Sequence, residues 1–221
     1  MMKLSWWKIL SILLIFYTLF AGFLFKVPAL PILHETIRNL YFHVTMWFSM
    51  IIILFVSLWH SIKYLSNFKM EHDIVANQAA NVGMLFGFIG VTTGAIWAKY
   101  TWGAWWVNDA KLNGAAITLL FYLAYQILRG ALDEEQKRAR IAAIYNIFSY
   151  VMLIVFLMVL PRMTDSLHPG NGGNPGFGGY DLDNTMKLVF YPAIIGWTLL
   201  GVWMMQLGVR YQKLLRKKWN N

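Results

Sequence analysis

Apolar and polar positions alternate along this chain in long blocks. Six apolar blocks, each near the ~20 residues that cross a hydrocarbon core ~30 Å thick, are separated by short charged segments. They cover approximately residues 7–25, 41–65, 74–98, 112–128, 141–160 and 187–207. Within lipid, a helix satisfies its own backbone hydrogen bonds, whereas an isolated strand does not. The pattern therefore predicts an all-α, polytopic membrane protein with six transmembrane helices and a single membrane-embedded domain over residues 1–221.

Composition supports the same class of protein. Apolar residues make up 58% of the chain and charged residues 13%, against about 25% charged residues in an average soluble domain. The first apolar block is followed directly by Lys26-Val27-Pro28 and by no small-residue cleavage site. We therefore expect it to be a retained helix rather than a removed signal peptide.

The basic residues predict the orientation of these helices. Lys and Arg number 13 in the N-terminal segment and around residues 62–73, 129–140 and 208–221, but 6 around residues 26–40, 98–111 and 161–187. The positive-inside rule then places both termini in the cytoplasm and the three sparser loops outside. The formal charge of +9 is mostly cytoplasmic and is suited to anionic lipid. Nucleic acid is not an expected partner, because no folded basic surface is available.

Two further observations narrow the chemistry. The chain has no cysteine, which excludes disulfides and thiolate-held iron–sulfur clusters. The third block contains glycines at small-xxx-small spacing and two amides on one face, Asn77 and Asn81, which favour close helix packing and interhelical hydrogen bonds. The glycines are Gly83, Gly87, Gly90 and Gly94.

Both informative outer loops carry unusual residues. The loop around 98–111 is rich in tryptophan: Trp97, Trp102, Trp105 and Trp106 fall within ten positions. Such a cluster is either a membrane-interface aromatic belt or a platform for a large flat ligand. The loop 161–184 is rich in glycine and is either a linker or a segment that closes over a ligand.

Histidines are the candidate ligands in these outer segments. His43 lies at the start of the second block and His168 in the glycine-rich loop, whereas His60 and His72 lie on the cytoplasmic side and are given no role. Two imidazoles, flat aromatic side chains and nearby cations are what haem requires. The candidate cations are Lys99, Lys111, Arg38 and Arg162. Asp109 precedes the fourth block and either caps that helix or orients a ligating histidine or the ligand.

Three stretches of the sequence resemble those of a known protein family. WGAWWVNDAKL resembles the tryptophan-rich "WWD" motif of the CcmC/CcsA family of haem-handling membrane proteins of c-type cytochrome maturation. YFHVTMWFSM resembles the histidine-bearing second helix of that family, and SLHPG resembles the Leu-His-Gln-Gly of its final outer loop. Six helices and about 220 residues resemble the shorter CcmC type more than the longer CcsA type. The similarity covers roughly residues 38–203.

The resemblance implies a site and a function. His43 and His168 would be the axial ligands of haem b, and the haem-presenting loop would comprise Trp97, Trp102, Gly103, Trp105, Trp106, Asp109 and Lys111. The protein would bind haem at the outer face of the bacterial cytoplasmic membrane. It would pass the haem to a periplasmic haem chaperone of the CcmE type, beside the subunits of an ABC transporter. It would be a haem-transfer protein and not an enzyme.

This sequence departs from the family pattern at a few positions. Asn108 stands where the family usually has another Trp, Lys111 where it usually has Arg, and Asn113-Gly114 where it usually has Thr-Ser. His34 has no evident family counterpart. Three alternative functions stay open: a CcsA-like component of a cytochrome c synthase, a haem b electron-transfer subunit, and a purely structural membrane protein.

Overall fold

Long helices make up almost the whole structure. The computed structural model describes residues 5–30, 32–168 and 182–219, and these contain helices and connections but no strand. Six of the helical segments are long and apolar enough to cross a membrane, which confirms the predicted fold class. The elements are α1 (Trp6–Leu24), the 3₁₀-helix η1 (His34–Asn39), α2 (Leu40–Asn67), α3 (Met70–Trp102), α4 (Ala110–Gly130), α5 (Glu135–Ile154), the π-helix η2 (Val155–Val159), α6 (Leu160–Met163) and α7 (Asn184–Trp219).

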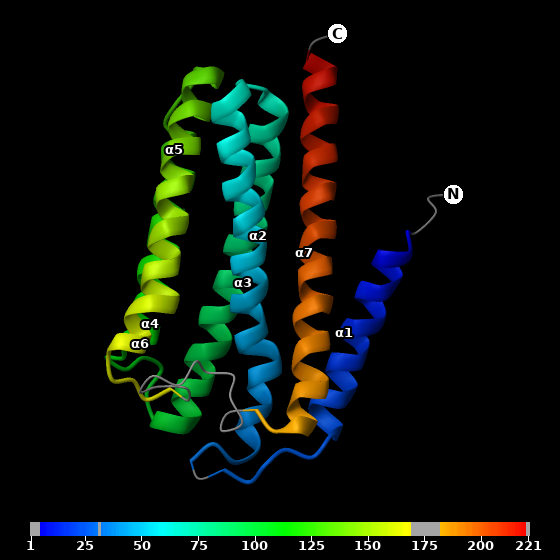
Figure 1. Cartoon of the computed structure of the whole chain (residues 1–221), viewed down its shortest axis with the longest axis vertical. Coiled ribbons are helices and arrows are strands. Elements are labelled where there is room, and N and C mark those ends of the chain that lie inside the picture. The colour runs from blue at the N-terminus through cyan, green and yellow to red at the C-terminus, as the bar shows by residue number, and fades with distance from the viewer. Residues whose placement is uncertain (1–4, 31, 169–181, 220–221) are drawn as a thin grey trace.

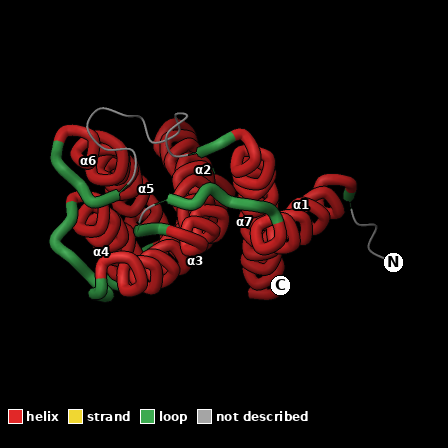
Figure 2. The backbone as a smooth tube through the Cα atoms, turned by 90° about the horizontal axis from the view of Figure 1, so that it is seen from below, coloured by secondary structure: helices red, strands yellow, loops and turns green. Residues whose placement is uncertain are grey.

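Helix α2 is the centre of the bundle. It packs against α3, α5 and α7, while α1 packs on α7 and α4 packs on α5. Figures 1 and 2 show the resulting arrangement, with α1 and α7 at one side and α4, α5 and α6 at the other. The two marked termini lie towards the same end of the bundle, and the α3–α4 connection lies at the opposite end (Figure 1). The fully buried core between the central helices includes Met50, Ile53, Leu54 and Tyr122.

The glycines of α3 permit the close packing that the sequence predicts. A methyl group added at Gly83 would lie 2.5 Å from Leu54 of α2, and one added at Gly87 would lie 2.5 Å from Leu119 of α4. The predicted amide contact is present for Asn81, which accepts a 2.7 Å hydrogen bond from Gln126 of α4, whereas the buried Oδ1 of Asn77 has no hydrogen-bond partner among the described residues. Helix α3 is therefore held between α2 and α4 at distances that larger side chains would not allow.

The third helix is longer than the hydropathy pattern suggests. Helix α3 ends at Trp102, so Trp97 and Trp102 lie on its last turns and only residues 103–109 are non-helical. The helix ends where Gly103 adopts a left-handed conformation, with φ of 79°. That conformation strains residues with a Cβ atom and is common directly after a helix. The outer Trp-rich loop is thus shorter than the expected 98–111, because polar residues past the apolar block continue the helix until a glycine ends it.

The second outer loop lies mostly outside the described residues. Its first part, up to His168, and its last two residues before α7 are described, whereas residues 169–181 are not. Before it, α5 continues through η2 into α6. A π-helix turn of this kind widens a helix locally and often accompanies a functional site.

The orientation of the bundle stays a prediction, and single cysteines can test it because the chain has none. Ser66→Cys and Thr164→Cys place a thiol at exposed positions near opposite ends of the bundle. In intact spheroplasts an impermeant maleimide is expected to label Thr164→Cys and to leave Ser66→Cys unlabelled until the membrane is permeabilised. The reverse labelling would show that the termini face outward.

Candidate functional site

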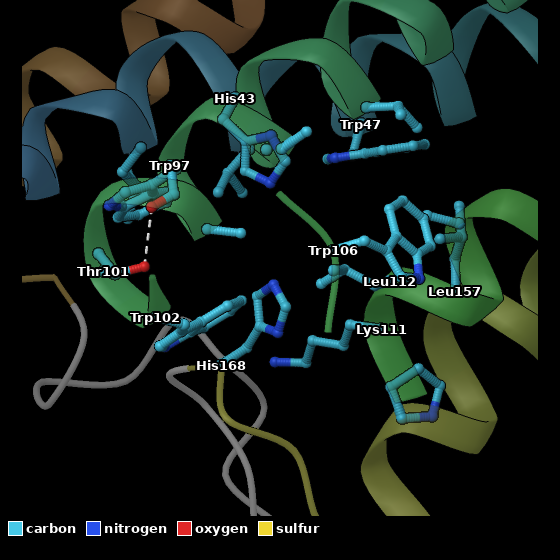
Figure 3. A pocket seen from close by; sticks show the side chains of 18 of the residues that line it. His43, Trp47, Trp97, Thr101, Trp102, Trp106, Lys111, Leu112, Leu157 and His168 are labelled. Carbon is cyan, nitrogen blue, oxygen red and sulfur yellow. Dashed lines mark hydrogen bonds between the residues drawn. The ribbon is translucent and has the colours of Figure 1, made fainter. Parts of the chain in front are cut away.

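A cavity lies at the end of the bundle where α2, α3, α4 and α6 meet. Its walls are mainly apolar, and two histidines, four tryptophans and two cationic side chains line it. Figure 3 shows His43 and His168 on opposite sides of this space, with both rings pointing into it. The polar and aromatic lining residues are His43, Trp47, Trp97, Trp102, Trp106, Lys111, Arg162 and His168.

His43 is held rigidly within the helical core. Its side chain projects from the first turns of α2, and the residue is only 9% exposed. The Nδ1 atom lies 2.9 Å from the carbonyl oxygen of Gly90 and 3.3 Å from the hydroxyl of Thr93, both on α3. Donation from Nδ1–H to the carbonyl leaves the lone pair on Nε2, the form that ligates a metal. The ring is therefore both fixed and in the tautomer suited to an iron ligand.

The fit of His43 depends on a glycine one turn further along α3. A Cβ atom at Gly94 would lie 2.5 Å from Cε1 of His43 and 3.1 Å from its Nδ1. Any larger residue would push the imidazole from its position, because a methyl group cannot share that space with the ring. Gly94 belongs to the small-residue pattern noted in the sequence, but its contact with His43 could not be read from that pattern.

Asp109 holds His168, which lies on the opposite side of the cavity from His43. The Nδ1 atom of His168 lies 3.0 Å from a carboxylate oxygen of Asp109 and 3.3 Å from the hydroxyl of Ser166. A carboxylate that accepts from Nδ1–H fixes the tautomer and makes Nε2 a better ligand, as in many metal sites. His168, like His43, thus has its Nδ1 engaged and its other ring nitrogen available.

Asp109 caps α4, one of the two roles considered for it, and it also contacts the segment that carries His168. One oxygen accepts from the backbone N–H of Lys111 at 2.8 Å and of Leu112 at 3.4 Å, which caps α4. The other accepts from the N–H of Leu167 at 2.8 Å, which ties the segment carrying His168 to the start of α4. Burial alone would raise the pKa of this carboxyl group, but the hydrogen bonds from His168 and Leu167 outweigh burial and lower it. Asp109 is therefore ionised at neutral pH, and its contacts weaken only when strong acid protonates it.

Aromatic rings flank both histidines. Trp97 and Trp47 lie edge-on to His43, with ring centroids 5.9 and 6.2 Å away, and Trp102 lies edge-on to His168 at 4.9 Å. The indole N–H of Trp97 donates to Thr36 of η1 at 3.0 Å, which fixes that ring. Trp47 was not singled out from the sequence, although its spacing four residues after His43 puts both on one face of α2.

The two adjacent tryptophans of the loop, Trp105 and Trp106, lie in different surroundings. Trp106 lines the cavity, whereas Trp105 is 58% exposed and is not among the lining residues. Trp106 donates to the side chain of Asn113 at 3.3 Å, and Asn113 donates to Asn108 at 2.7 Å. Asn108 and Asn113 are two of the departures from the family pattern, so these substitutions form one network that supports Trp106.

Of the four candidate cations, two line the cavity. Lys111 and Arg162 are among its walls, and Arg162 also donates to the carbonyl of Met158 at 2.7 Å. Arg38 instead pairs with Glu35 and with carbonyls at the end of α1, and Lys99 donates to the carbonyl of Gly103 at 2.9 Å. The expectation that Arg38 and Lys99 face the ligand is therefore not supported, because each is engaged outside the cavity.

The remaining histidines lie away from this cavity. His34 is exposed in η1, and His60 and His72 lie near the other ends of α2 and α3, where their rings face each other. From the sequence, His60 and His72 are interpreted as interfacial or loop residues without a role, and their contact is not expected. In the described part of the chain, no group of three or more His, Cys, Asp or Glu side chains forms a metal site.

These features define a class of protein: a six-helix membrane protein with a ligand cavity at one end, faced by two oriented imidazoles. Comparison with known families identifies it further. The family model of heme exporter protein C (CcmC) matches residues 1–221, and the chain belongs to this family. With six candidate spans and relatives from bacteria, it is a multi-pass protein of the bacterial inner membrane.

Individual relatives agree with the family assignment. The chain is 28% identical to heme exporter protein C of Bradyrhizobium diazoefficiens over 83% of its own length and 68% of that protein. It is 27% identical to the protein of the same name from Rhodobacter capsulatus, over 76% of its length and 69% of that protein. With the Escherichia coli K12 protein the identity is 29%, over 68% of this chain and 59% of the relative.

Proposed function

We propose that this protein binds haem between His43 and His168 at the outer face of the cytoplasmic membrane and transfers it to a periplasmic haem chaperone. The process served would be the maturation of c-type cytochromes, as the name and family of its relatives suggest. The observation that carries the proposal is that two imidazoles, 125 residues apart in sequence, face one cavity with their Nδ1 atoms engaged. Each then has Nε2 available for iron.

The other lining residues suit the rest of a haem molecule. Trp47, Trp97, Trp102 and Trp106 offer apolar surface to the porphyrin, while Lys111 and Arg162 offer positive charge to its two propionates. No cysteine is present to attach the haem covalently, so the bound form would be haem b, held by coordination and packing. The haem is cargo here, and the chemistry of attachment would belong to a later acceptor rather than to this protein.

The two proposed ligands differ in how firmly they are held, which suits transfer. His43 projects from a long helix and is locked against α3, whereas His168 follows α6 in a non-helical segment and is held by Asp109 and Ser166. We infer that His168 is the ligand that is exchanged when an acceptor offers its own. The CcmE-type chaperone would approach at this side, where Trp105 is exposed, and an ABC transporter would assemble on the helices.

If haem is transferred in this way, changes at Trp105 and Trp102 should have separable effects on haem transfer and haem binding. Trp105→Ala is expected to leave the haem content of the purified protein near wild type and to reduce the haem found on the chaperone, because Trp105 lies outside the cavity. Trp102→Ala is expected to weaken haem binding by about 0.5–1.5 kcal/mol, the usual energy of one aromatic contact. Both quantities are measured in the same cells by haem staining and absorption spectra.

Trp6→Ala is the matched control, since Trp6 is exposed at the far end of α1. Unchanged transfer in Trp105→Ala would remove Trp105 from the presenting surface. A protein that binds no haem at all, with or without added haem, would overturn the proposed function itself.

A further inference from the structure

A second pair of histidines lies at the opposite end of the hairpin formed by α2 and α3. His60 is on the last turns of α2 and His72 on the first turn of α3. Their Nδ1 atoms lie 3.2 Å apart, and the ring centroids are 5.2 Å apart. His60 and His43 are 17 residues apart on the same helix, about 26 Å along its axis, so this pair is separate from the haem cavity.

The separation of these two nitrogens matches that of two ligands on one metal ion. Imidazole nitrogens bind zinc at ~2.0–2.1 Å, so two of them on the same ion lie ~2.9 Å apart at a right angle and ~3.4 Å apart at the tetrahedral angle. The observed 3.2 Å falls between these values. A hydrogen bond between the two histidines would also fit this distance. In that arrangement one Nδ1 donates to the other, and no further feature of the structure is explained.

The pair is partly buried, and its charged neighbours are engaged elsewhere. Both histidines are partly buried, and the neighbouring Lys63 has its ammonium group over the ring of Trp59, 5.3 Å from the centroid. Asp73, which follows His72, is already paired with Arg129 through two hydrogen bonds of 2.6 and 2.8 Å. Among the described residues no third histidine or carboxylate completes the group, so water or a partner would supply the other positions.

We propose that His60 and His72 form a two-histidine site for a divalent transition metal of the zinc or copper class, which joins α2 to α3. The ion would join the two helices at the end of the hairpin opposite His43, Gly90 and Gly94, so haem binding should not depend on it. With only two protein ligands, the site would bind its ion reversibly.

Zinc bound per chain tests this site. Equilibrium dialysis of the detergent-purified full-length protein against micromolar zinc is expected to give one ion fewer per chain in His60→Gln and in His72→Gln than in wild type. The double variant should lose no more than either single variant, because one imidazole alone does not hold the ion. His34→Gln, which alters an exposed histidine elsewhere, is the matched control and should bind as much zinc as wild type.

A replacement ligand separates binding from a folding defect. His72→Cys introduces the chain's only thiol, and cobalt added to this variant is expected to give an intense sulfur-to-cobalt absorption band that His60→Gln abolishes. Equal zinc content in all variants, or no such band in a folded His72→Cys protein, would show that the pair is a hydrogen bond only. Haem content is measured in parallel and should stay unchanged, so failure here would not be confused with failure of the proposed haem function.

Discussion

Replacing either His43 or His168 by glycine is expected to remove most of the haem that the protein retains during purification. Each change deletes one of the two imidazoles that face the cavity, and the loss of one iron ligand should weaken haem affinity about tenfold or more, which corresponds to about 1.4 kcal/mol. Added imidazole should restore part of the binding, because the glycine leaves a space of the shape that imidazole fills. The absorption spectrum of the purified protein, with and without imidazole, measures both effects.

The controls for this prediction come from the same chain. His34→Gly alters an exposed histidine that does not line the cavity, and it should keep the wild-type spectrum. Asp109→Asn should weaken haem binding less than either glycine variant, since asparagine still caps α4 but no longer offers His168 a charged acceptor. If both glycine variants kept a wild-type low-spin spectrum, the ligand assignment would be wrong, although the family assignment would stand.

Much of the fold could be predicted from hydropathy alone. The six apolar blocks gave the six spans because the bilayer leaves the backbone few alternatives to a helix. The ends of the helices could not be predicted equally well. Helix α3 continues through Lys99 and Thr101 to Trp102, since polar residues outside the apolar block are compatible with a helix until Gly103 ends it.

The residues of the site could be predicted by type but not by partner. The motif gave His43, His168, Trp102 and Asp109, and the structure brings the first three to one cavity with Asp109 directly behind His168. Which rings face the cavity depends on how each helix is rotated against its neighbours, and that is set by packing between segments far apart in sequence. For this reason the roles of Trp47 and Gly94 and the exposure of Trp105 were not foreseen.

The meeting of His60 and His72 has the same origin. Their separation of 12 residues across a helix–helix connection does not determine the rotation of either helix. Only the packed hairpin shows that both rings point to one spot. In contrast, the interhelical bond between Gln126 and Asn81 was expected in kind, because amides in membrane helices commonly pair across an interface.

Gly94→Ala is expected to reduce haem binding about as much as loss of His43 itself. The added methyl group would lie 2.5 Å from Cε1 of His43, so the ring must move and its 2.9 Å contact with the carbonyl of Gly90 must break. Overpacking of this kind typically costs about 1–3 kcal/mol, and here the ring rather than the backbone is the group able to move. Haem content of the purified variant, read from its absorption spectrum, measures the effect.

Imidazole distinguishes this steric effect from a general loss of folding. In Gly94→Ala the displaced ring still occupies part of the cavity, so added imidazole should restore little haem binding. In the double variant His43→Gly with Gly94→Ala, imidazole should restore part of the binding but less than in His43→Gly alone, because the added methyl group still lies beside the imidazole site, although an untethered ring can shift away from it. Gly130→Ala is the matched control, because a methyl group there meets no atom within 4 Å and alanine is favoured in a helix. Wild-type haem content in Gly94→Ala would mean that His43 does not need its present position to hold haem, and that result would remove it as the fixed ligand.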